Sequence, residues 1–156
     1  MNLSEHLAKH LREVYFGGNW TDVSLKEHVA DLSWQQATTQ VQSFNTIAKL
    51  VFHMNYYVSA ALKVFRGGAL DASDKYSFDL PPIQSEADWQ SLLEKTWSEA
   101  RLLAELVEQM PEQQLKEPFA DGKYGNNFRN IEGVIEHVHY HLGQLVMLKK
   151  MIVAAV

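Results

Sequence analysis

Four stretches of the chain repeat hydrophobic residues at intervals of three or four, which is the spacing of one face of an α-helix. The stretches are 3–16, 45–65, 85–110 and 131–153. The first three end at residues that stop helices: Gly17-Gly18, Gly67-Gly68 and Pro111. The pattern therefore predicts four long helices.

Long connections separate these helices. They are 19–42, 69–84 and 112–130. The first includes a short helical pattern at 25–32 and the spacing of a capping box at Ser33 and Gln36. Its apolar residues are expected to pack across the bundle: Trp20, Val23, Leu25, Val29, Leu32 and Trp34. Because no stretch alternates like a strand beside a hairpin signal, we expect an all-α, single-domain four-helix bundle over 1–156, with long crossover connections.

Composition narrows the range of functions. The chain has 156 residues, 46% hydrophobic and 21% charged, which suits one globular domain. Lys and Arg number 14 against 19 Asp and Glu, so the formal net charge is -5 and binding to nucleic acid is not expected. The absence of Cys excludes disulfides, thiolate metal ligands and a cysteine nucleophile. The charged, amphipathic N-terminus and the lack of about 18 consecutive apolar residues predict no signal peptide, no membrane span and a cytoplasmic location.

Three histidines lie within five residues of the last predicted helix: His137, His139 and His141. His137 and His141 are four residues apart, so they lie on the same helix face. The apolar positions of this helix place His141 largely inside the bundle and His137 at its edge. His139 falls on the other flank, where we expect it to be exposed or at an interface. Only His137 and His141 are therefore expected to share a metal ion.

This spacing alone is weak evidence, since His6 and His10 have it on the solvent side of the first helix. A third candidate ligand, His53, lies on the flank of the apolar stripe of 45–65. Taken singly, each histidine also fits a hydrogen-bonded side chain at the edge of the core. Together, three neutral imidazoles can hold an ion and leave a coordination position for water or substrate. Other kinds of site have less support. The sequence lacks the second Glu-x-x-His of a di-iron carboxylate bundle and the His-Glu-x-x-His of a zinc protease. It also lacks the Gly-x-Ser-x-Gly motif and a phosphate loop.

The last helix resembles the C-terminal motif of the DinB-like superfamily, also called DinB/YfiT-like metalloenzymes. That motif, His-x-x-x-His followed by x-Gly-Gln, is matched by His137, His141, Gly143 and Gln144. A further family ligand in the middle of the second long helix is matched by His53. The GGNW and GKYGNNFRN segments are similar to a branch of unknown function.

The resemblance implies an up-down-down-up four-helix bundle, a homodimer, and a divalent metal, nickel or zinc, on His53, His137 and His141. It also implies chemistry on a small-molecule substrate, such as transfer of a low-molecular-weight thiol to an electrophile.

Two hypotheses follow. In the first, the protein is a metal-dependent enzyme, with Tyr57 and Gln144 as contacts in the substrate pocket. Core packing or a hydrogen bond to a ligand is the alternative role for both residues. In the second, the protein is a non-catalytic, metal-binding or stress-related dimeric bundle. The four tryptophans, Trp20, Trp34, Trp89 and Trp97, would then serve packing and a dimer interface. An open coordination position beside a pocket favours the first hypothesis.

Overall fold

The computed structural model describes residues 1–154, so the last two residues of the predicted domain lie outside the described part. Its helices are α1 (Leu3–Phe16), α2 (Leu25–Val29), α3 (Trp34–Thr38), α4 (Ile47–Phe65), the 3-10 turn η1 (Asp74–Tyr76), α5 (Glu86–Glu108), α6 (Glu112–Leu115) and α7 (Asn127–Ala154). Residues 1–154 contain an isolated bridge between Pro118 and Asn126 but no β-strand. The predicted all-α fold is confirmed.

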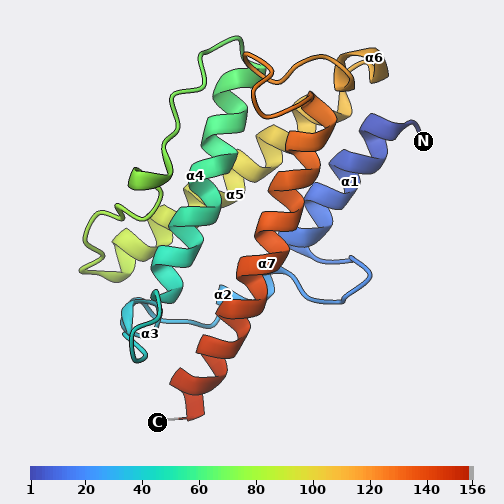
Figure 1. Ribbon diagram of the computed structural model, residues 1–156. Coiled ribbons are helices and arrows are strands. Elements are labelled where there is room, and N and C mark those ends of the chain that lie inside the picture. The colour runs from blue at the N-terminus through green and yellow to red at the C-terminus, as the bar shows by residue number, and fades with distance from the viewer. Residues whose placement is uncertain (155–156) are drawn as a thin grey trace.

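The four long helices pack side by side (Figure 1). α1 and α4 each pack against both α5 and α7, so these two pairs form the four sides of a bundle. In Figure 1, α1 and α7 run downward, whereas α4 and α5 run upward. None of the helices within 1–154 is both long enough and apolar enough to cross a membrane.

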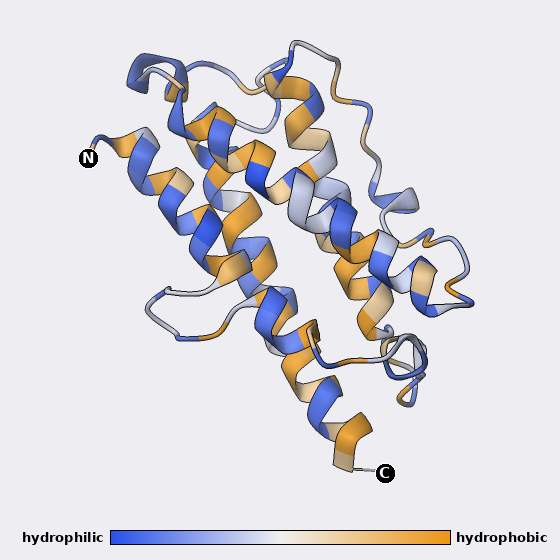
Figure 2. Ribbon diagram, turned by 180° about the vertical axis from the view of Figure 1, so that it is seen from behind, coloured by the Kyte–Doolittle hydropathy of each residue, from blue (hydrophilic) through white to orange (hydrophobic). Residues whose placement is uncertain are grey.

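The core forms where the apolar stripes of the helices meet. Figure 2 shows hydrophobic and hydrophilic residues alternating around each long helix. Leu7, Leu11 and Val14 of α1 are buried, as their spacing predicts. Trp89 is fully buried on α5, and its indole N–H donates to the Leu32 carbonyl at 3.0 Å. This bond ties the first crossover connection to α5.

Several predicted helix boundaries are confirmed. Gly17 caps α1 with φ +106°, a conformation that favours glycine. Ser33 and Gln36 form the predicted capping box of α3, and Ser85 caps α5. The cap of α1 is Asn2, which forms a capping box with Glu5.

The last helix begins at Asn127, four residues before the predicted start, because the side chain of Asn126 caps its first turn. The Asn126 side chain accepts from the Arg129 N–H at 2.9 Å, which is the bond of an N-cap. Asn127 donates from its side chain to the Gln114 carbonyl. The expectation that 112–130 is a loop throughout is wrong, because the first turn of α7 lies within it.

The expectation that Trp20 packs across the bundle is wrong. Leu25, Val29 and Leu32 of the same connection are buried, but Trp20 is 98% exposed. Neighbouring Asn19 explains the difference, because its amide donates to the Glu13 and Val23 carbonyls and holds the turn next to α1. The turn is thus fixed by Asn19, and the Trp20 side chain extends into solvent.

Candidate metal centre

His53 of α4 and His137 and His141 of α7 come together between these two neighbouring helices. The Nε2 atoms of His53 and His137 are 3.0 Å apart. One nitrogen of each of the three rings lies within 4.8 Å of the others. His53 and His141 are 5% and 8% exposed, and His137 is half-buried, as the helix pattern predicts for the two residues on α7.

The separation of these nitrogens suits a shared ion. Zinc binds histidine nitrogen at about 2.0–2.1 Å, so two nitrogens on one ion at about 90–110° are about 2.9–3.4 Å apart. The 3.0 Å between His53 and His137 falls in this range. Three imidazoles without thiolate or carboxylate are a donor set that suits zinc, nickel, copper or iron. The residues present therefore fit a divalent transition metal.

Gln144 sets the tautomer of His141. Its Oε1 lies 2.8 Å from His141 Nδ1. Because a carbonyl oxygen only accepts, His141 carries its proton on Nδ1 and leaves the lone pair of Nε2 for a cation. The Nδ1 atoms of His53 and His137 are buried and have no hydrogen-bond partner among the described residues. Burial and His141 lower the pKa of His53 more than the Ser77 backbone raises it.

Burial keeps two of the three rings neutral. It lowers the pKa of His137 to about 4, with further lowering by His141 and His53. The pKa of His53 is lowered by burial first and by His141 second. Both rings are therefore uncharged at pH 7, which is the form that binds cations.

Tyr57 lies beside two of the histidines. Its ring centroid is 5.3 Å from that of His53 and 4.9 Å from that of His137. Its hydroxyl donates to Asp74 Oδ1 at 2.6 Å. Burial, with this hydrogen bond, raises the pKa of Tyr57 to about 12, and the same bond lowers the pKa of Asp74. At neutral pH the phenol is therefore protonated and the carboxylate is charged.

Segment 66–85, which connects α4 to α5 along the side of the bundle, completes the surroundings of His53 (Figure 1). Phe78 of this segment stacks on the His53 ring, with centroids 3.8 Å apart and planes 8° apart. The Tyr56 hydroxyl donates to the Ser73 carbonyl at 3.0 Å and accepts from the Ser73 N–H at 2.9 Å. Tyr56 and Tyr57 therefore hold residues 73 and 74 against α4.

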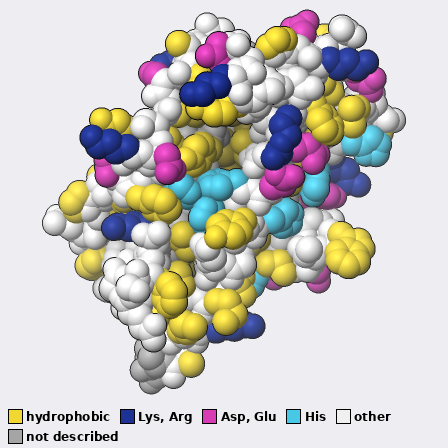
Figure 3. Space-filling model, in the orientation of Figure 1, with side chains coloured by type: hydrophobic (Ala, Val, Ile, Leu, Met, Phe, Trp, Pro, Cys, Tyr) yellow, Lys and Arg dark blue, Asp and Glu magenta, His cyan; other side chains and the backbone are white. Residues whose placement is uncertain are grey.

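A cavity of about 720 Å³ opens beside the three histidines. Figure 3 shows histidine side chains in the hollow of this face, with acidic and basic side chains on its sides. Its lining comes from α4, segment 66–85, the loop before α7, and α7 itself: His53, Tyr57, Ala60, Ala61, Leu70, Ala72, Asp74, Phe119, Tyr124, Arg129, Asn130, Gly133, Val134, His137, Tyr140 and His141. A small molecule of moderate size can therefore reach the histidines.

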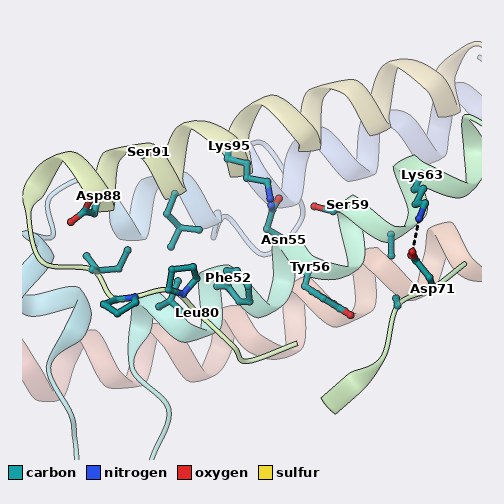
Figure 4. Close-up of a pocket in the computed structure, with 16 residues that line it drawn as sticks. Phe52, Asn55, Tyr56, Ser59, Lys63, Asp71, Leu80, Asp88, Ser91 and Lys95 are labelled. Atoms are coloured by element: carbon teal, nitrogen blue, oxygen red, sulfur yellow. Dashed lines mark hydrogen bonds and ion pairs between the residues drawn. The ribbon is translucent and has the colours of Figure 1, made fainter. Parts of the chain in front are cut away.

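A second cavity, of about 610 Å³, is lined by α4, α5 and segment 66–85, and shares Ala60 and Ala72 with the first (Figure 4). Lys63 and Lys95 extend into it from α4 and α5, and Lys63 pairs with Asp71 at 2.5 Å. Its described lining contains no histidine. The cavity beside His53 is therefore the candidate for metal chemistry.

The remaining predicted site residues are placed as follows. Tyr57 lines the cavity, whereas Gln144 is exposed, does not line it and bonds to His141. His139 lies apart from the cluster and faces His10, with ring centroids 6.0 Å apart.

Three further residues were not identified from sequence: Phe78, Asp74 and Arg129. No sequence pattern indicates Phe78 and Asp74, because both belong to segment 66–85, which has no repeating pattern. Arg129 lies before residue 131, the predicted start of the last helix, so the helical pattern gave it no direction.

Comparison with known proteins shows to which family the chain belongs. The model of the DinB superfamily matches residues 19–144, which is most of the chain and includes His53, His137, His141 and Gln144. Neither the curated proteins nor the solved structures give a significant match. Because the family model covers far more than half of the sequence, the chain belongs to the DinB superfamily.

Proposed function

We propose that this protein is a divalent-metal-dependent enzyme that acts on a small molecule, with nickel or zinc held by His53, His137 and His141. The observation that carries this proposal is the position of the three nitrogens, within 4.8 Å of one another, at the side of a cavity of about 720 Å³. A structural zinc site is closed by four protein ligands, whereas a catalytic site has three and an open position. Three histidines next to a cavity correspond to the catalytic arrangement.

When bound, the ion would lower the pKa of a thiol or water beside it and make a nucleophile at neutral pH. The residues of the chain have separate roles. Gln144 keeps the His141 lone pair directed at the ion, and Phe78 fixes the plane of the His53 ring. Tyr57, held by Asp74, forms the wall against which a substrate would be oriented.

We propose that the nucleophile is a low-molecular-weight thiol. A borderline ion on nitrogen ligands accepts sulfur readily, and zinc binds sulfur at about 2.3 Å. The cavity lies in the range of about 300–1,000 Å³ that small-molecule sites occupy. The chain itself has no Cys, so the thiol would come from solution.

Metal titration of the purified protein tests the site. We expect one equivalent of nickel or zinc to bind, His137→Ala to weaken this binding at least about 10-fold, and His139→Ala to leave it unchanged. His139 is the matched control because it lies on the same helix outside the cluster. Equal binding by wild type and His137→Ala would refute the site. Binding of the ion without any binding of small thiols would refute the thiol as the nucleophile and leave the metal site intact.

A further inference from the structure

Arg129 lies in the same cavity as the three histidines, on the strip of α7 that carries two of them. Arg129, Gly133, His137 and His141 follow one another at intervals of four residues, and all four line the cavity. Residues four apart lie on one helix face, about 6 Å apart along the axis. The strip therefore connects a guanidinium to the metal ligands.

The Arg129 guanidinium lies beside Gly133. A Cβ atom added at Gly133 would be 3.6 Å from Arg129 Nη1, and Nη1 also donates to Glu136 Oε2 at 2.9 Å. The side chain thus runs along α7, past the position that lacks a side chain, to Glu136. Its guanidinium lies beside residue 133, about one helical turn, or about 6 Å, from the level of His137.

The ion pair with Glu136 does not account for this arrangement. The Arg129 and Glu136 side chains are 60% and 62% exposed, and such pairs contribute little to stability. Among the described residues, the guanidinium bonds to Glu136 alone, which leaves most of its N–H donors for another acceptor. Arg129 is also the one Lys or Arg in the described lining of the cavity.

The cavity that holds Arg129 and the histidines also has apolar walls. Ala61, Leu70, Phe119 and Val134 contribute to its walls. A ligand that fits has one group for the ion, a short hydrocarbon part and one anionic group for a planar guanidinium. A carboxylate matches a single Arg through two parallel hydrogen bonds, and the described lining provides no second cation for the larger charge of a phosphate.

We propose that the substrate thiol carries a carboxylate, with its sulfur at the three histidines and its carboxylate on Arg129. This inference rests on the proposed function. The probe is 4-mercaptobutanoate, compared with the uncharged 4-mercaptobutan-1-ol, and binding to the nickel- or zinc-loaded protein is measured by calorimetry. Because the carboxylate of the probe would accept hydrogen bonds from the charged Arg129 guanidinium, wild type should bind it at least about 10-fold more tightly than the alcohol.

Variants assign this preference to Arg129. Arg129→Gln should bind both probes with similar affinity and should bind the metal as wild type does. Arg129→Lys should retain part of the preference, because it keeps the charge but loses the planar fork. Lys150→Gln removes one exposed charge from α7 away from the cavity and should leave the preference unchanged.

Substitution at Gly133 gives an independent test that does not depend on charge. Gly133→Leu should weaken carboxylate binding about 10-fold or more, because the new side chain fills the space beside the guanidinium. It should still fold, since leucine favours helix over glycine. Lys150→Leu is the control, because it adds the same side chain at an exposed position of α7 outside the cavity.

The outcomes separate the two proposals. Metal binding and thiol binding without preference for the carboxylate, or a preference that survives Arg129→Gln, would overturn this inference and leave the proposed function intact. Absence of metal binding in wild type would overturn both.

Discussion

The hydrogen bond from His141 to Gln144 makes a quantitative prediction about metal affinity. In Gln144→Met the side chain keeps its length but loses the acceptor 2.8 Å from His141 Nδ1. The His141 ring is then free to carry its proton on Nε2, which removes the lone pair that a cation needs. Partners of this kind are worth about 10–100-fold in metal affinity. Because Gln144 is exposed, water replaces part of the lost bond, so we expect about a 10-fold loss, or about 1.4 kcal/mol.

Competition with a chromogenic chelator measures this loss for zinc and nickel in parallel. Gln144→Glu should bind at least as tightly as wild type, because a carboxylate accepts the same bond more strongly. Lys150→Met, an exposed substitution on the same helix, controls for general effects and should change nothing. Full affinity in Gln144→Met would refute the role assigned to the hydrogen bond.

Three further predictions concern the metal-free protein. The folded-state pKa of His137 is about 4 and its unfolded value is about 6.5, so the unfolded state binds more protons in this window. Chemical denaturation should therefore show the free energy of unfolding falling by about 1–2 kcal/mol from pH 6.5 to pH 4. This is less than the full pKa shift implies, because His137 is only half-buried. His137→Gln should flatten this dependence on pH. Gly143→Ala should raise the free energy of unfolding by about 0.5–1 kcal/mol, because the site is helical and open; an unchanged midpoint would contradict this. Tyr56→Phe removes both bonds to Ser73 and should increase hydrogen exchange in segment 66–85, whereas Trp20→Ala should leave it unchanged.

The three clustered histidines could be predicted because they lie within regular helices. A 3.6-residue period converts position along the chain into direction around the axis, which separated His137 and His141 from His139. The same argument placed His53 at the flank of its stripe. Once α4 and α7 are neighbours, these directions alone bring the three rings together.

The surroundings of the three histidines depend on segments whose sequence has no helical repeat. Phe78 and Asp74 reach His53 and Tyr57 because segment 66–85 runs along α4, and no repeat in its sequence specifies that path. The error at Trp20 has the same origin. Hydrophobicity predicted that it packs, but the hydrogen bonds of Asn19 decided where the turn lies.

Segment 66–85 contacts the candidate metal site and the helix that carries His53. Phe78 can hold the His53 ring in one plane only while the segment lies against α4, and Tyr56 and Tyr57 are the side chains whose hydroxyls hold residues 73 and 74 there. If the proposed ion requires one orientation of His53, it would favour the docked segment, and the docked segment would favour the ion by the same free energy. Asp74 and Ala72 of this segment also line the cavity, so its docking shapes the space in which a substrate would meet the histidines.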